Sequence, residues 1–293
     1  MLLFDDFREI VKTDEPLAPY LWFRLGGPAA YFARPHGVEQ LAGLIKRCRE
    51  ANYPFKILSG GSNILAGDDR LEALVIHLES PAFSDITTDG TTIETGGAVP
   101  LTALISQSAR SGLGGLEIFT GIPGTVGGAL RSQASNRHGS FGQFVRKATV
   151  LDTAGEIQTR DRDDLGSAEG ALNLEDPVIL SAQFVLEPEE PETVVRRMRR
   201  IWIVKKESQP YGHQSTGCMF KNISPDLSAG SLIDQAGLKG TRIGGAEVSD
   251  RHANFIIAHQ GAKASDVLQL LEQIRQRIWQ QYGYDLQLQI QVW

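Results

Sequence analysis

Residues 55–63, with the sequence Phe-Lys-Ile-Leu-Ser-Gly-Gly-Ser-Asn, decide the fold predicted for this chain. Phe55–Leu58 has the short apolar composition of a buried strand. It runs into the small residues 59–63, which can turn several backbone N–H groups toward one point. Upstream, Tyr31–Pro35 reads as a strand and Val38–Glu50 carries apolar residues at helical spacing. This order predicts a βαβ-like unit that ends in an anion-binding loop.

A second glycine loop, Gly121–Gly128, lies in the middle of the chain and reads Gly-Ile-Pro-Gly-Thr-Val-Gly-Gly. Its proline fixes the first turn, and a helix running on through Ala129 would present N-terminal N–H groups to the same anion. Either loop alone is typical of a tight turn, but the two together predict a diphosphate ligand held from both sides. Neither has the spacing of a Rossmann motif or the lysine of a P-loop.

The remaining pattern mixes short β-rich runs with helices and predicts an α+β protein. Further strands are expected at 74–78, 91–95, 148–152, 156–159, 178–186, 254–258 and 285–292, and further helices at 100–110, 193–206, 228–236 and 265–282. Acidic residues and prolines at 187–192 mark an exposed boundary before the basic amphipathic helix at 193–206.

Length and charge exclude several classes of protein. A chain of 293 residues allows two or three modules, and a net charge of -6 argues against non-specific binding to nucleic acid. The two cysteines, Cys48 and Cys218, suggest neither a disulfide nor a metal site and fit a reducing compartment. The N-terminus lacks a signal-peptide pattern, and no apolar run approaches ~18 residues. We expect a cytoplasmic protein with no membrane partner.

Seven ordered motifs cover nearly the whole chain. They are Phe23–Ala29, Leu58–Leu65, Gly121–Gly128, Gly217–Asn222, Ala236–Gly240, Arg242–Ala246 and His252–Phe255. As a set they resemble the UDP-N-acetylenolpyruvoylglucosamine reductase family of peptidoglycan synthesis. The absence of an inserted tyrosine-bearing loop resembles the shorter subtype of that family.

The resemblance implies a two-lobed FAD-binding domain of the PCMH/vanillyl-alcohol-oxidase type, with lobes at 1–75 and 76–192, and a C-terminal α+β substrate domain at 193–293. In this family a hydride passes from NADPH to tightly bound FAD, and then to the enolpyruvyl group of UDP-N-acetylglucosamine enolpyruvate, which gives UDP-N-acetylmuramate. The partner implied is a small UDP sugar, with no metal and no obligate protein partner.

The resemblance also assigns site residues. The FAD contacts implied are Ser59, Gly60, Gly61, Ser62, Asn63, Ile64, Gly121, Ile122, Pro123, Gly124, Thr125, Gly127, Gly128 and Val178. The substrate contacts implied are Lys205, Lys221, Asn222 and Arg242, since Lys and Arg suit phosphate by charge and geometry. For Lys205 and Lys206 a solvated helix face is an equal alternative. His252 is a further candidate, although its setting is more typical of a packed histidine.

The catalytic positions of the family carry other residues in this chain. Cys218 stands where the family has the serine that protonates the reduced substrate, and a thiol, with a reference pKa of ~8.5, is the stronger acid. Ala168 stands at the position of an arginine and Gln289 at that of a glutamate. Glutamine cannot supply a carboxylic proton. Loss of the arginine is graver, because one charge-assisted donor can contribute on the order of 3 kcal/mol.

Arg131, Arg137 and Arg162 are candidates to replace the missing charge, although each is more typical of a solvated surface arginine. Three functions therefore stay open. The first is a working reductase with Cys218 and Gln289 as catalytic residues. The second is a flavin-binding paralogue with a binding or regulatory role, and the third is a flavin oxidoreductase that acts on another small substrate.

Overall fold

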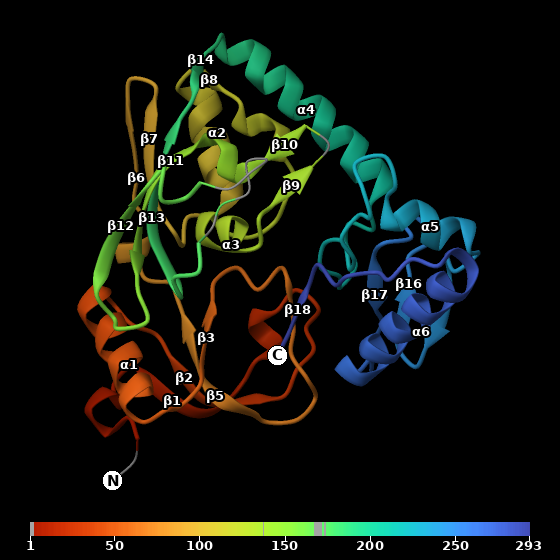
Figure 1. Ribbon diagram of the computed structural model, residues 1–293, viewed down its shortest axis with the longest axis horizontal. Coiled ribbons are helices and arrows are strands. Elements are labelled where there is room, and N and C mark those ends of the chain that lie inside the picture. Colours follow the sequence, from red (N-terminus) through yellow and green to blue (C-terminus); the bar gives the residue numbers. More distant parts are fainter. Residues whose placement is uncertain (1–2, 137, 167–171, 173) are drawn as a thin grey trace. The chain divides into compact units, whose positions relative to one another are not determined.

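The computed structural model describes residues 3–136, 138–166, 172 and 174–293 (Figure 1). The chain folds into two compact units, and each unit is assembled from separate stretches of sequence. Unit 1 consists of the residues up to Glu15, Ala29–Gly60 and Glu72–Trp202, and unit 2 of Pro16–Pro28, Gly61–Leu71 and Ile203–Trp293.

The first part of unit 1 is a sheet with strand order β1-β2-β5-β3. Its strands are β1 (Val11–Pro16), β2 (Pro28–Ala33), β3 (Phe55–Leu58) and β5 (Leu71–His77). Helix α1 (Val38–Glu50) buries the apolar stripe that predicted it, and this stripe joins β5 residues in one core. The strand and helix predicted at 55–58 and 38–50 are confirmed. The neighbour of β3 is β5, which runs parallel to it.

The second part of unit 1 is an antiparallel sheet with strand order β12-β11-β13-β7-β6. Its strands are β6 (Ile86–Asp89), β7 (Thr92–Gly96), β11 (Val145–Leu151), β12 (Ile157–Asp161) and β13 (Val178–Val185). Helices α2 (Leu101–Arg110) and α3 (Val126–Arg131) contribute to a second core, with Phe119, Phe141 and Phe184 at its centre. Unit 1 thus has two hydrophobic cores, and the core around α1 also includes Leu151, Val178 and Leu180 from strands of the second sheet.

Unit 2 has its own core, which the long helix α6 (Ala264–Tyr282) shares with α5 (Ala229–Gln235). Its antiparallel sheet contains β15 (Arg242–Ile243), β16 (Ala246–Val248) and β17 (Ile256–Ala258). The Asp68 carboxylate accepts hydrogen bonds from the first N–H groups of α6, at Ala264 (2.8 Å) and Ser265 (2.9 Å). These hydrogen bonds join residues 61–71 to helix α6, which begins nearly two hundred residues later in the sequence.

Shorter elements complete the chain. Strand pairs are β4 (Ile64–Leu65) with β18 (Gln291–Val292), β8 (Leu113–Gly114) with β14 (Glu187–Pro188), and β9 (Ser135–Asn136) with β10 (Gly139–Ser140); 3₁₀ helices are Asp5–Phe7, Ala18–Tyr20, Pro81–Phe83, Leu116–Phe119 and Phe141–Phe144. Helix α4 (Pro191–Ser208) contains the basic segment predicted to be helical. None of the helices in the described part of the chain offers an apolar stretch that would cross a bilayer.

The continuous closing strand predicted at 285–292 is wrong. Leu288 bridges Phe220 in the antiparallel sense, whereas Gln291 and Val292 pair in parallel with β4. The segment therefore changes partner around Gln289 and forms no single ladder. The alternating pattern of this segment reflects the burial of Leu286 and Ile290. One long strand and two short pairings would bury these residues equally well, so the pattern does not distinguish between them.

Candidate active site

The two glycine loops are in contact within unit 1. The chain leaves the buried end of β3 through Ser59 and Gly60. A methyl group on Gly60 would lie only 2.9 Å from the Cα atom of Gly124, so glycine alone allows this approach. Beside it, the Thr125 hydroxyl donates to Ser59 Oγ at 3.0 Å. The two loops therefore meet at Ser59 and Gly60 of the first loop and at Gly124 and Thr125 of the second.

The second loop is shaped by left-handed glycines and a helix cap. Gly121 has φ of +80° and Gly124 of +106°, which a side chain would strain. Thr125 is the N-cap of α3, and its hydroxyl accepts from the Gly128 N–H at 3.3 Å. One threonine therefore orders the second loop and joins it to the first.

In each unit, several loop N–H groups donate to no acceptor among the described residues. These N–H groups belong to Gly60, Gly121, Gly124 and Thr125 in unit 1, and to Gly61, Ser62 and Asn63 in unit 2. Gly61 and Thr125 are buried. Since buried backbone donors are nearly always paired, the open N–H groups of the buried Gly61 and Thr125 each mark a position where an external anion can bind.

Other predicted cofactor residues use their polar groups inside the protein. The N–H groups of Ile122, Gly127 and Gly128 donate to Phe119 O, Gly97 O and Thr125 Oγ1. Pro123 has no N–H. Val178 begins β13, and its side chain lies in the core of the first lobe.

In unit 2, Asn63 and Ile64 bind the C-terminal segment. Asn63 Nδ2 donates to Gln289 O (3.1 Å), and Gln291 N donates to Asn63 O (2.9 Å). Ile64 pairs with Gln291 in the β4–β18 ladder. The end of the first loop thus fixes the backbone that carries Gln289.

Cys218 lies directly before a backbone frame held by Asn254. The Asn254 side chain accepts from Phe220 N (2.9 Å) and donates to Phe220 O (2.8 Å), while Met219 N donates to Asn254 O (2.9 Å). Gln289 N donates to Met219 O at 2.7 Å. The structure therefore brings Gln289 beside the residue that follows Cys218. The sequence marked Asn254 only as part of a motif and gave no sign of this clamp.

The half-buried Cys218 thiol holds its proton firmly. Burial raises the pKa of Cys218 to about 11, and the Lys205 ammonium acts in the opposite direction. Burial also lowers the pKa of Lys205. At neutral pH Cys218 is therefore a thiol and a potential proton donor, rather than a thiolate nucleophile.

Of the predicted substrate residues, Lys221 and Asn222 are exposed. Lys221 N donates to Gln287 O (2.8 Å), which fixes its backbone. Asn222 Oδ1 accepts from Ala229 N (3.2 Å) at the start of α5, so the oxygen of this side chain has a structural partner.

Arg242 is held across the β15–β16 pair by the carboxylate directly opposite, that of Glu247. His259 Nε2 lies 2.6 Å from the same carboxylate. Burial alone would raise the pKa of Glu247, but its hydrogen bonds with His259 and Arg242 lower it below its ordinary value. Most of the Arg242 side chain stays exposed and can meet an anion.

His252 behaves as a packed histidine. Its ring meets Phe255 edge-on at 4.8 Å, and its Nδ1 accepts from Asn254 N at 3.3 Å. Burial lowers its pKa, which favours the neutral ring.

Two of the candidate replacement cations, Arg131 and Arg162, donate to backbone carbonyl oxygens in unit 1. Arg131 donates to Leu174 O (2.7 Å) and to Asp176 O, so its description as a solvated surface arginine is wrong. Arg162 donates to Gly142 O at 2.9 Å. Arg137 and Ala168 lie outside the described residues.

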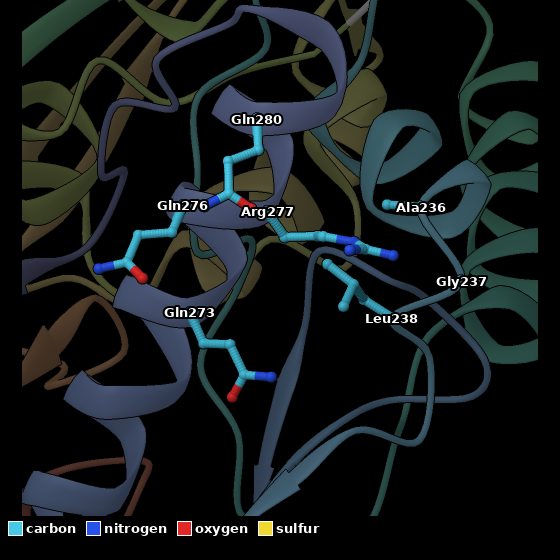
Figure 2. A pocket seen from close by; sticks show the side chains of 7 residues that line it. All are labelled: Ala236, Gly237, Leu238, Gln273, Gln276, Arg277 and Gln280. Atoms are coloured by element: carbon cyan, nitrogen blue, oxygen red, sulfur yellow. The ribbon is translucent and has the colours of Figure 1, made fainter.

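A hollow of about 360 Å³ lies in unit 2, between the end of α5 and helix α6, and Figure 2 shows the residues that line it. Gln273, Arg277 and Gln280 line its α6 side, and Leu238 lines the other. None of the predicted site residues borders it. It is therefore separate from the candidate active site.

Comparisons with known proteins match two parts of the chain to two different domain families. Residues 29–160 match the family described as an FAD binding domain, and residues 209–293 match the C-terminal domain of UDP-N-acetylenolpyruvoylglucosamine reductase. Cholesterol oxidase from B. sterolicum shares the fold at a TM-score of 0.50 and 15% identity, over 64% of this chain and 39% of that chain. The α+β fold with a two-lobed FAD-binding domain of the PCMH type is confirmed.

Two relatives align over nearly their full lengths. The UDP-N-acetylenolpyruvoylglucosamine reductase of Heliobacterium modesticaldum is 37% identical over 98% of this chain and 92% of its own. The crystal structure of the Thermus caldophilus enzyme of that name has a TM-score of 0.80 and 32% identity, over 97% of this chain and 98% of its own. The chain belongs to the UDP-N-acetylenolpyruvoylglucosamine reductase family.

Proposed function

We propose that this chain reduces UDP-N-acetylglucosamine enolpyruvate to UDP-N-acetylmuramate, with NADPH as hydride donor and FAD as tightly bound cofactor. Family membership supports this class of reaction. The observation that carries the proposal is the set of open N–H groups around the contact between Gly60 and Gly124. Such a reaction in peptidoglycan synthesis supports a cytoplasmic location.

The loops of unit 1 fit the diphosphate of FAD. The N–H groups of Gly60, Gly124 and Thr125 can donate to phosphate oxygens, as glycine-rich loops do in other anion sites. Bound FAD would take a hydride from NADPH and deliver it to the enolpyruvyl double bond. We assign residues 1–75 and 76–192 to the two FAD lobes and 193–293 to the UDP sugar.

Cys218 is proposed to supply the proton that completes the reduction. Hydride addition to a double bond leaves a carbanion or enol, which needs one proton. Because its pKa is raised to about 11, the Cys218 thiol carries that proton throughout the neutral range. The Lys205 charge would stabilise the thiolate left behind. Gln289 can donate a hydrogen bond to the substrate carboxylate but has no carboxylic proton.

Exposed cations of unit 2 are proposed to bind the diphosphate of the UDP sugar. Lys221 stands on backbone that Gln287 holds in place. The ion pair with Glu247 limits the freedom of Arg242, so less entropy is lost when this guanidinium meets a phosphate.

An anaerobic titration of the purified protein tests the proposal in two steps. NADPH should bleach the flavin absorbance, and the enolpyruvyl UDP sugar should restore it with formation of UDP-N-acetylmuramate. UDP-N-acetylglucosamine, which lacks the enolpyruvyl group, should restore nothing. A flavin that bleaches but never responds to the enolpyruvyl sugar would overturn the assignment and favour the paralogue. Electron exchange with an unrelated alcohol or acid in its place would favour the oxidoreductase.

A further inference from the structure

His77 lies at the end of strand β5, beside the residue that precedes the first glycine loop. In the parallel β3–β5 pair His77 is opposite Leu58, and Leu78 N donates to Leu58 O at 3.0 Å (Figure 1). Ser59 and Gly60 follow Leu58 directly. All of these residues belong to unit 1, so the end of β5 lies next to the part of the loop that this unit contributes.

The His77 side chain is packed between several groups of unit 1. It is 14% exposed, and its ring lies 5.8 Å from the ring of Phe32 on the neighbouring strand β2. Its Nδ1 lies 3.2 Å from Glu79 Oε2, and Arg34 Nε lies 3.2 Å from the other oxygen of that carboxylate. These contacts on two sides hold the ring in place.

The His77 ring also donates a hydrogen bond to the Ser59 backbone. This bond favours the protonated ring, so its acceptor is the carbonyl oxygen, which is the only acceptor of the backbone. Burial lowers the pKa of His77, and the Arg34 charge lowers it further, whereas Glu79 acts in the opposite direction. The ring is therefore neutral at pH 7, and its single N–H is the one given to Ser59.

The bond to the Ser59 carbonyl determines where the next N–H points. A peptide bond is planar, and in its trans form the C=O and the N–H point to opposite sides. No cis peptide bond occurs among the described residues. Since His77 holds the Ser59 oxygen, the Gly60 N–H points away from His77. This N–H is one of the loop donors for which the described part of the chain offers no acceptor.

We infer that His77 is a positioning residue of the FAD site, which aims the Gly60 N–H at the diphosphate by holding the Ser59 carbonyl. The inference rests on the FAD site of the proposed function and on none of its substrate residues. Ser59 is held at two atoms, because its Oγ accepts from the Thr125 hydroxyl of the second loop and its carbonyl oxygen accepts from His77.

Two other roles fit His77 less well. An acid–base group needs a proton that it can exchange, whereas the single N–H of this packed ring is used by Ser59. A role in packing alone would make any ring of similar size an adequate replacement, since Glu79 keeps its ion pair with Arg34 when the imidazole is removed. The hydrogen bond to Ser59 is what such a replacement would lack.

Titration of the cofactor-free protein with FAD tests the inference. His77→Phe keeps a ring against Phe32 but removes the donor, so the FAD dissociation constant should rise roughly tenfold, about the contribution of one hydrogen bond to a charged group. His77→Gln keeps an N–H donor and should recover most of the affinity. Riboflavin, which lacks phosphate, should bind all variants as it binds the wild type. His36→Phe is the matched control, because the His36 side chain is exposed in the same unit.

Amide-resolved NMR locates the effect. In the wild type, the His77 ring N–H should exchange slowly with water, and FAD should shift the Gly60 N–H signal. In His77→Phe the shift of Gly60 should shrink, while that of Gly121 in the second loop should persist.

Three results would overturn the role of His77 in a wild type that binds FAD. They are an unchanged FAD affinity in His77→Phe, a His77→Gln protein as weak as His77→Phe, and a wild-type ring N–H that exchanges as fast as that of an exposed histidine. The last of these needs no variant to fold. A wild type that binds no FAD would overturn the proposed function itself.

Discussion

The glycine loops of unit 1 and the Cys218 segment of unit 2 differ in what builds them. In the loops the backbone forms the site, because Gly60 meets Gly124 where no side chain fits. Around Cys218 the backbone frame is held by Asn254, while the side chains expected from the family, serine and glutamate, are Cys218 and Gln289. A site formed by backbone atoms limits which residue types can occupy its positions. A site formed by side chains can acquire a different chemistry while the fold stays the same.

The largest effect on the reaction rate is expected at Cys218, where a side chain supplies the proposed chemistry. Cys218→Ala removes the proposed proton donor, and flavin reoxidation by the enolpyruvyl UDP sugar should slow by roughly 10²–10⁴-fold. Reduction of the flavin by NADPH should not change. Stopped-flow absorbance separates the two steps, and Cys218→Ser should recover much of the lost rate. A Cys218→Ala protein that turns over within a few-fold of wild type would remove Cys218 from the mechanism.

The raised pKa of Cys218 can be tested by the reactivity of its thiol. With a pKa of about 11, alkylation of this thiol by iodoacetamide at pH 8 should be roughly 10²-fold slower than that of an ordinary cysteine. Mass spectrometry measures the rate, and unfolded protein should react normally. The folded state holds this proton more tightly than the unfolded state. The stability from this thiol is therefore complete below pH 9 and declines as pH rises toward 11.

At the glycine loops, Gly60→Ala should lower both the stability of the folded protein and its affinity for FAD. The added methyl would force the Gly124 backbone away, at a cost of about 1–3 kcal/mol. The FAD dissociation constant should rise by roughly 10–100-fold. Gly67→Ala is the control, since its methyl would make an ordinary 3.5 Å contact with Trp293 O. Thermal unfolding and FAD titration measure both effects. Unchanged FAD affinity in Gly60→Ala would contradict the assignment of this loop.

The smallest effect is expected at Thr125. Thr125→Val keeps the shape but loses the cap of α3 and the hydrogen bond to Ser59, which should lower the free energy of unfolding by about 1 kcal/mol. Thr125→Ser keeps the hydroxyl and should lose less. Urea denaturation compares the two variants, and equal losses would show that the hydroxyl is unimportant.

Local patterns explain what the sequence predicted correctly. The helix at 38–50 follows from its apolar spacing, and the strand at 55–58 from a short apolar run before glycines. The contact between the two loops followed from two glycine clusters that suit one ligand. Each of these features depends on neighbouring residues or on glycine itself.

Features set by distant partners could not be predicted. The segment 285–292 changes partner because Phe220 pairs with Leu288, whereas β4 pairs with Gln291 and Val292. The bonds from Asn254 to Phe220 and from Arg131 to Leu174 O join residues far apart in sequence. A single sequence shows that such polar side chains exist but not which backbone groups they meet.

The most direct test of the two-loop site compares FAD with riboflavin, which has the flavin ring but no phosphate. In amide-resolved NMR of the cofactor-free protein, FAD should shift the N–H signals of Gly60, Gly121, Gly124 and Thr125, because these donors have no acceptor in the described structure. Riboflavin should leave them nearly unchanged. Signals that ignore FAD, or that respond equally to riboflavin, would contradict a diphosphate held by these loops.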